Sequence, residues 1–110
     1  MSITFQLEGQ EFIALNGGPQ FTFSQAISFF VSWESQEEVD RLWGQLSEDG
    51  EQQQCGWLVD RFGVSWQIVP TALGEMLGDS DAERSQRVMQ AMLRMRKIDI
   101  QALEDAYNQA

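Results

Sequence analysis

Residues 35–50, SQEEVDRLWGQLSEDG, predict a helix that lies between two groups of strands. Ser35 and Glu38 stand three residues apart, the spacing of a capping box, in which side chains satisfy free amide hydrogens at a helix start. Gly50 is the expected end of the helix, because glycine readily leaves the helical conformation. Apolar residues recur at helical spacing along one face: Val39, Leu42, Trp43 and Leu46. The segment is therefore an amphipathic helix with one face for a protein core.

Short strands are predicted on both sides of this helix. Before it, residues 3–15 indicate a hairpin with its turn at Gly9-Gln10, and residues 26–32 indicate a strand. After it, QQQCGWLVD (52–60) predicts a short strand and GVSWQIVP (63–70) an alternating last strand. This order predicts an α+β domain, with a mixed or antiparallel sheet and the helix on one face.

The alternation assigns the strand residues to two faces of the sheet. One set is expected to pack under the helix: Ile27, Phe29, Val31, Val64, Trp66 and Ile68. The other set is expected on the opposite face: Ser28, Phe30, Ser32, Ser65 and Gln67. A sheet face that mixes serine, glutamine and one aromatic side chain is either exposed to solvent or lines a cup.

The last third of the chain is predicted to be helical. Residues 70–77 favour a short helix, and Ser80 with Glu83 forms a second capping box for a helix that runs to about Met95. Asp99 is the expected N-cap of a final helix. Methionines recur on the middle helix at positions 89, 92 and 95, and we expect them to pack on the protein's own sheet or across a dimer contact.

Composition excludes several classes of function. A chain of 110 residues is one domain, and its net charge of −10 disfavours nucleic acid and anionic membranes as partners. It has no histidine and a single cysteine, Cys55, which removes the common zinc sets and every histidine-dependent triad. No long apolar run or leader is present, so the expected location is the cytoplasm.

Basic residues cluster between positions 84 and 98, where five stand without an acidic residue among them. Such a cluster can meet an acidic partner or a phosphate. It can also balance the acidic groups of its own domain or of a neighbouring subunit, and we prefer this second interpretation because isolated surface charges do little else.

Four segments together resemble the PhnB-like, demethylubiquinone methyltransferase-like group of the vicinal oxygen chelate (glyoxalase/bleomycin resistance/dioxygenase) superfamily. They are LEGQEFIALNGGPQF (7–21), AISFFVSWESQEEVDRLWGQLSEDG (26–50), QCGWLVDRFGVSWQIVP (54–70) and RVMQAMLRMRKIDIQALEDAY (87–107). The resemblance covers nearly the whole chain and depends on no single motif. It implies glyoxalase-like βαβββ modules that pair round a cup for a small molecule, often with a metal.

The resemblance also divides the single domain of 1–110 into three parts. Residues 1–16 correspond to a hairpin from an incomplete first module, 25–70 to a complete βαβββ module, and 71–110 to a helical tail. Either the chain is a shortened relative that only folds and dimerises, or two chains supply each other's missing walls. Because unpaired edges and uncovered apolar faces promote association, we expect a homodimer, with or without exchanged elements.

The resemblance identifies Gln67 with the position where metal-using relatives carry a carboxylate. A neutral amide oxygen is a poor replacement for a carboxylate on a divalent cation. The other positions of this set hold Gln25 or Ser28 on the module's opening strand and Asn16 in the other half-module. We therefore expect a cup without a metal or other cofactor, and a divalent metal is the alternative.

The loop NGGPQFTF (16–23) is the best candidate for part of a site, because its glycines let the backbone approach a ligand closely. Relatives often carry a histidine where Gln20 stands, which argues against proton transfer there. The same segment does not open a helix, as the glycine-rich turn of the usual methyl-donor site requires. The alternative for the loop is a plain connector whose phenylalanines pack in the core.

The sequence therefore favours a protein that binds an unknown small molecule and has no evident catalytic residues. Its expected ligand contacts are Gln67, Ser65, Ser28, Phe30, Asn16, Gln20 and Trp57. An apolar enclosure with a few oriented polar groups is the usual make-up of such a site. The alternative class is an enzyme, either a metal-dependent lyase or dioxygenase relative or the methyltransferase of the family label.

Overall fold

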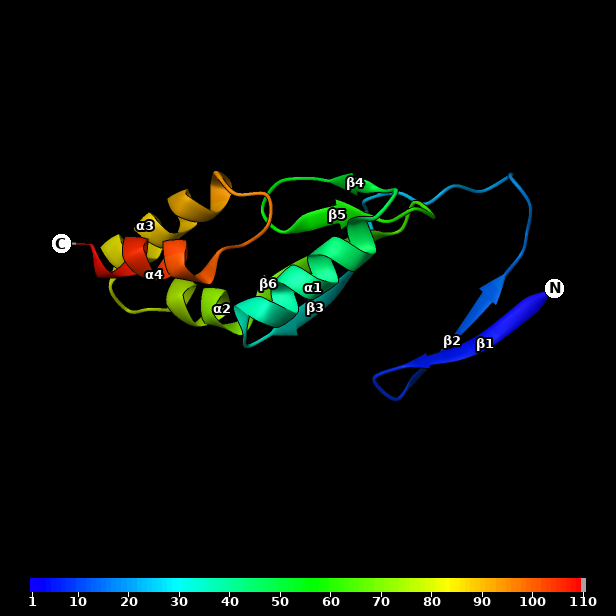
Figure 1. The fold of residues 1–110 in the computed structure, drawn as a ribbon, viewed down its shortest axis with the longest axis horizontal. Helices are drawn as coiled ribbons and strands as arrows, with labels where there is room; N and C mark the ends of the chain where they lie inside the picture. The colour runs from blue at the N-terminus through cyan, green and yellow to red at the C-terminus, as the bar shows by residue number, and fades with distance from the viewer. Residues whose placement is uncertain (110) are drawn as a thin grey trace.

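A computed structural model describes residues 1–109 and confirms the α+β class (Figure 1). The elements in chain order are β1 (Ser2–Leu7), β2 (Gln10–Leu15), β3 (Ser28–Trp33), α1 (Gln36–Ser47), β4 (Glu51–Gln52), β5 (Trp57–Val59), β6 (Ser65–Pro70), α2 (Thr71–Leu77), α3 (Ala82–Leu93) and α4 (Ile100–Asn108). None of the helices in this part of the chain has the length and apolar character that crossing a bilayer requires.

The central sheet has the strand order β3-β6-β5-β4, and β1 pairs with β2 in a separate hairpin. Strand β3 runs parallel to β6, and the other pairs are antiparallel. The single strand predicted over residues 52–60 is in fact two short strands, β4 and β5. The chain reverses between them, where Cys55 and Gly56 both take positive φ, 60° and 84°. Residues 28–70 therefore form a βαβββ unit.

Helix α1 covers one face of this sheet, and its predicted start at Ser35 is confirmed. The Ser35 Oγ accepts a hydrogen bond from the Glu38 amide at 3.2 Å. The helix ends at Ser47, and Gly50 serves a different purpose from the predicted one. A Cβ at Gly50 would lie 2.1 Å from the carbonyl oxygen of Val59, so glycine is required there because the chain passes close to β5.

The first core lies between α1 and the sheet. Its buried side chains are Val39, Trp43, Leu58 and Ile68, and Val31 and Trp66 pack against them as predicted. The prediction for Ile27 is wrong, because this side chain is 78% exposed. Strand β3 begins only at Ser28, and α1 lies mainly over β6 and β5, so nothing covers the residue before the edge strand.

The second core lies among the tail helices α2, α3 and α4. It buries Leu73, Val88, Ile98 and Leu103, and two of the three predicted methionines, Met92 and Met95, pack against it. The predicted cap at Asp99 is confirmed, since its carboxylate accepts from the Ala102 amide at 3.3 Å.

The cap predicted for α3 was wrong by one residue. Asp81, and not Ser80, is the N-cap, and its carboxylate accepts from the amides of Glu83 and Arg84. A carboxylate is the stronger acceptor and also complements the positive end of the helix dipole, so it displaces the neighbouring hydroxyl. The helix ends at Leu93, two residues before the predicted end.

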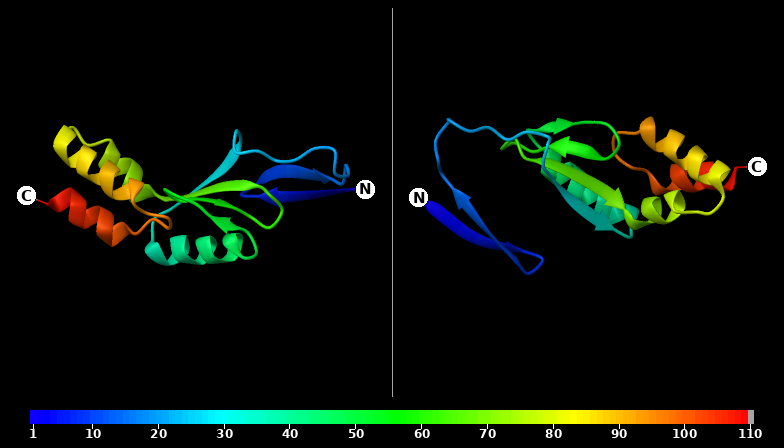
Figure 2. Two further views of the ribbon diagram at one scale, coloured as in Figure 1. Left: turned by 90° about the horizontal axis from the view of Figure 1, so that it is seen from above. Right: turned by 180° about the vertical axis from the view of Figure 1, so that it is seen from behind.

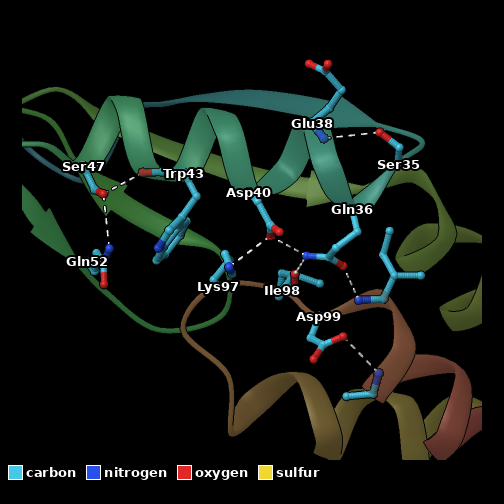
Figure 3. A network of polar contacts seen from close by, with 12 residues as sticks. Ser35, Gln36, Glu38, Asp40, Trp43, Ser47, Gln52, Lys97, Ile98 and Asp99 are labelled. Carbon is cyan, nitrogen blue, oxygen red and sulfur yellow. Dashed lines mark hydrogen bonds and ion pairs between the residues drawn. The ribbon is translucent and has the colours of Figure 1, made fainter.

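A polar junction joins α1 to the tail (Figure 3). The Gln36 side-chain amide donates to the Ile98 carbonyl oxygen at 2.9 Å and to the Asp40 carboxylate at 2.8 Å. The Gln36 side-chain oxygen accepts from the Ile100 amide at 2.7 Å. Lys97 Nζ lies 3.0 Å from Asp40 Oδ1. One glutamine and one ion pair thus hold the tail against the helix of the βαβββ unit.

The junction predicts a specific dependence of stability on pH. The hydrogen bond from Gln36, and then Lys97, hold the pKa of Asp40 below its usual value, so the folded state binds its proton less tightly than the unfolded state. The contribution of Asp40 is therefore fully present above about pH 5 and is lost as the pH falls through about 4 and below. Because the carboxylate is exposed, we expect at most about 1 kcal/mol.

The measurement is the urea-induced unfolding free energy of the wild type and of Asp40→Asn, taken at neutral pH and in mild acid. The two proteins should differ at neutral pH and converge in acid. The asparagine keeps the acceptor oxygen and loses only the charge, so the difference should depend on whether Asp40 is ionised. An equal difference at both pH values would contradict a stabilising role for the Asp40 charge.

The β1–β2 hairpin is confirmed, with its turn one residue earlier than predicted. Glu8 and Gly9 form the two-residue loop, with φ of 51° and 78°, and Leu7 pairs with Gln10. The hairpin lies apart from both cores (Figures 1 and 2). Of its strand residues only Phe12 is half-buried, and the others are exposed. The whole molecule is accordingly elongated, 57 × 26 × 23 Å.

Candidate functional site

The sheet face opposite α1 carries most of the predicted site residues. Cross-strand pairing places Phe30 and Trp57 on either side of Gln67, one on β3 and the other on β5. Ser28 pairs with Ser65 two residues along the same strands, and therefore on the same face. These residues are called the open-face cluster: Ser28, Phe30, Trp57, Ser65 and Gln67. The alternation in the sequence is sufficient to predict that they lie together.

A hydrogen bond orients the central glutamine of this cluster. Gln67 Nε2 donates to Ser28 Oγ at 2.9 Å, and both side chains are half-buried. This bond fixes the plane of the amide between two aromatic side chains. Ser65 is only 2% exposed and forms part of the floor, whereas Phe30 is 61% exposed and stands at the rim. The cluster is a polar centre with apolar flanks.

A groove of about 590 Å³ lies beside Trp57. Its other lining residues are Gln25, Glu51, Gln52, Gln53, Gln54 and Arg96. Two backbone hydrogen bonds build the groove, from the amides of Cys55 and Gly56 to the carbonyl oxygens of Met95 and Arg96, both at 2.8 Å. They hold the loop after α3 against the loop between β4 and β5. Trp57 is the residue that the groove and the open-face cluster share.

Sequence reasoning missed Arg96 and the groove residues 51–54. Within residues 1–109 no ion pair engages Arg96, although three others of the basic stretch contact their own domain. Arg87 donates to the carbonyl oxygens of Ala106 and Tyr107, and Lys97 pairs with Asp40. The third, Arg84, lies over a tyrosine ring. The one available signal was the run of basic residues after position 83, which does not say which of them faces a groove.

Asn16 and Gln20 are not brought to the open-face cluster. Both are exposed on the segment between β2 and β3, and the Asn16 amide donates to the Met1 carbonyl oxygen at 3.0 Å, which closes the base of the hairpin. Among the described residues, neither side chain hydrogen-bonds to Gln67 or Ser28, and neither lines the groove beside Trp57. In this single chain they belong to a different surface.

Carboxylate, thiol and imidazole ligands are not grouped around Gln67. Over residues 1–109 no three such side chains gather in an arrangement that could hold a metal ion. The polar partner of Gln67 is a serine hydroxyl, and both groups are neutral hydrogen-bonding groups. The arrangement can orient a ligand by hydrogen bonds and enclose it with aromatic rings, and Arg96 can contribute a positive charge at the adjoining groove.

The fold and its polar sheet face define a PhnB-like protein of the mixed α+β class. Residues 1–69 match the model of the family described as 3-demethylubiquinone-9 3-methyltransferase, so the chain belongs to this family. The match includes the hairpin, α1 and the open-face cluster. The tail, with Arg96, lies outside it. A comparison with curated proteins gives no match.

Two solved structures are similar to this chain. The PhnB protein from Bacillus cereus is 35% identical, with a TM-score of 0.60 over 64% of each chain. Protein PA1353 from Pseudomonas aeruginosa is 22% identical, with a TM-score of 0.53 over 64% of this chain and 62% of that one, and shows likeness of fold alone. The chain therefore spans less than two thirds of the length of these two relatives.

Proposed function

We propose that this protein binds a small molecule on the open-face cluster, in a cup that needs a second wall opposite the sheet. The observation that carries the proposal is the hydrogen bond from Gln67 to Ser28, which presents an oriented amide between Phe30 and Trp57. Small-molecule sites are mostly apolar enclosures with a few convergent polar groups, and the cluster has this composition.

The adjoining groove indicates the chemistry of the ligand. Trp57 offers an aromatic wall, the glutamines offer amide donors and acceptors, and Arg96 and Glu51 offer one charge of each sign. A small planar molecule that carries a carboxylate or a similar acceptor matches Trp57, the glutamine amides and Arg96. The proposed site takes no metal, because its central groups, the Gln67 amide and the Ser28 hydroxyl, are neutral.

The test uses ligand-observed NMR with a set of small aromatic acids and their uncharged amides. Binding to the wild type should weaken about ten-fold in Gln67→Ala and in Trp57→Ala, as expected for loss of a hydrogen bond or of an aromatic contact worth about 1–2 kcal/mol. The unfolding free energy of Gln67→Ala should fall by less than about 1.5 kcal/mol, the usual net value of one hydrogen bond.

Gln101→Ala is the matched control, because this glutamine is exposed on α4 and bonds only to Asp105 of the same helix among the described contacts. It should bind every probe as the wild type does. If Gln67→Ala binds as well as the control, the cluster is not the site. If no probe binds the wild type, the proposal is wrong, and the result favours the alternative that the chain only folds and associates.

The family description favours one second candidate, a methyltransferase. S-adenosylmethionine is the methyl donor to test, first by the thermal midpoint of unfolding and then by transfer of a labelled methyl group to a quinol acceptor. A shift of several degrees together with transfer would establish this activity. A divalent metal that shifts the midpoint by as much would instead support the metal-dependent lyase or dioxygenase class.

A further inference from the structure

Glu51 places a negative charge on the same side of the sheet as the open-face cluster. It lies on β4 opposite Val59, and Val59 lies opposite Ser65 of the cluster. Residues that face each other across paired strands share one side of a sheet, so Glu51 lies on the side of Trp57 and Gln67. Among the residues of β3 to β6 on this side, Glu51 alone is charged. The open face therefore has a negative end at its outer strand, β4.

Glu51 and Arg96 line the same groove beside Trp57 and carry opposite charges. Both residues are exposed, and within residues 1–109 neither side chain takes part in an ion pair. The backbone of each is nevertheless held in place. Glu51 pairs with Val59 in the sheet, and the Arg96 carbonyl oxygen accepts from the Gly56 amide at 2.8 Å. The groove thus presents two charges of opposite sign, each available to a ligand.

The charge of the surrounding domain favours a ligand without net charge. Residues 28–70 carry eight acidic and two basic side chains. A ligand with a carboxylate as its only charged group would be repelled by this excess, and one with only an ammonium group would leave Arg96 without a partner. A zwitterion, which carries both groups, avoids the net repulsion and can satisfy both side chains of the groove.

Trp57 adds an aromatic requirement to the two charges. The Gln53 amide donates to the Trp57 carbonyl oxygen at 2.9 Å, which continues the pairing of β4 with β5 and fixes the backbone of the groove at this point. Trp57 is half-buried, and aromatic pairs gain energy beyond the area that they bury. The groove volume of about 590 Å³ lies within the usual range for small-molecule sites. A ligand with an aromatic ring therefore fits beside the two charges.

We propose that the groove beside Trp57 binds an aromatic zwitterion, a molecule with a ring, a carboxylate and an ammonium group. Aromatic amino acids are the simplest members of this class. The Arg96 guanidinium donates to the carboxylate, the Glu51 carboxylate accepts from the ammonium group, and the ring lies against Trp57. This inference rests on the proposed function and narrows its ligand, because it adds an ammonium group to the aromatic acid.

The experiment is an NMR titration of the full chain at neutral pH and low salt with phenylalanine, 3-phenylpropanoate and 2-phenylethylamine. The wild type should bind phenylalanine about five-fold more tightly than either of the others, the most that one exposed ion pair usually contributes. Glu51→Gln should bind phenylalanine and 3-phenylpropanoate equally, and Arg96→Gln should bind phenylalanine and 2-phenylethylamine equally. Each variant thus loses one half of the selectivity, which a general loss of structure would not produce.

Glu48→Gln and Arg94→Gln are the controls, because each removes the same charge from an exposed residue that does not line the groove. Both should keep the selectivity of the wild type. A wild type that binds phenylalanine no more tightly than 3-phenylpropanoate, or controls that lose as much selectivity as the site variants, would overturn the inference. The dipeptide phenylalanylphenylalanine carries the same groups farther apart, so its affinity relative to phenylalanine distinguishes a short peptide from a free amino acid.

The two proposals can fail separately. If 3-phenylpropanoate binds in a manner that depends on Gln67 and the ammonium group of phenylalanine adds nothing, the zwitterion is wrong and the proposed function stands. If phenylalanine binds in a manner that depends on Glu51 and Arg96 and Gln67→Ala binds it as the wild type does, the groove stands and the open-face cluster is not the site.

Discussion

Gly56→Ala should lower the free energy of unfolding by about 2–4 kcal/mol, a large effect for a single substitution in a small domain. Gly56 has a φ of 84°, which a residue with a Cβ adopts only at a cost. The added Cβ would also lie 2.8 Å from the carbonyl oxygen of Ile68 and 3.1 Å from the Ile98 side chain. The first of these atoms is backbone and cannot move aside cheaply.

Two backbone hydrogen bonds of Gly56 make this position more sensitive to substitution. The Gly56 amide donates to Arg96, and its carbonyl oxygen accepts from the Ile68 amide, both at 2.8 Å. Any backbone shift that relieves the new contacts would weaken these bonds, which join β6 to the loop after α3. The fall in the thermal midpoint should therefore reach about 10 °C or more for a domain of this size.

Gly44→Ala is the control for Gly56→Ala. Gly44 lies within α1, and an added Cβ would meet nothing within 4 Å. Alanine is the better helix former, so this substitution should raise stability by about 0.5–1 kcal/mol. Differential scanning calorimetry of the two variants measures both effects. Equal midpoints would show that the packing around Gly56 is looser than described.

Leu58→Ala should lower the unfolding free energy by about 2–5 kcal/mol, the range for a buried leucine that leaves a cavity. Leu58 is fully buried on β5, in the core between α1 and the sheet. That core has only four buried side chains, so it has few neighbours that could move in to fill the space. A loss of this size is a large part of the total stability of a small domain.

Leu93→Ala removes the same atoms from a side chain that is 56% exposed on α3. It should cost less than about 1 kcal/mol, because little apolar surface leaves the protein interior. Urea unfolding curves of the two variants give the comparison. Similar losses in both would mean that the stability of the chain does not depend on the core under α1.

Local signals in the sequence predicted the elements that local chemistry determines. The Ser35 side chain starts α1 by accepting a hydrogen bond from the Glu38 backbone amide, and the alternation of residues 63–70 placed Gln67 opposite the helix. These features depend only on residues that lie close together in the sequence. The class of the fold followed from them, because one helix between strands must cover a sheet face.

The features that the sequence did not predict depend on distant parts of the chain. The reversal at Cys55 and Gly56 divides one predicted strand into two, and it is held by carbonyl oxygens of Met95 and Arg96, about 40 residues away. The same bonds bring Arg96 to the groove beside Trp57. The exposure of Ile27 likewise depends on where α1 crosses the sheet. The sequence near residue 27 does not indicate that position.

The junction at Gln36 couples the unfolding of the two cores. Each core has only four buried apolar side chains, too few for either half to persist alone, and Gln36 bonds the first turn of α1 to the backbone at Ile98 and Ile100. Unfolding of the tail would therefore destabilise the sheet, and unfolding of the sheet would destabilise the tail. From residue 28 onward, the chain should open and close as one cooperative unit, with the same protection against hydrogen exchange in α1 and in α4.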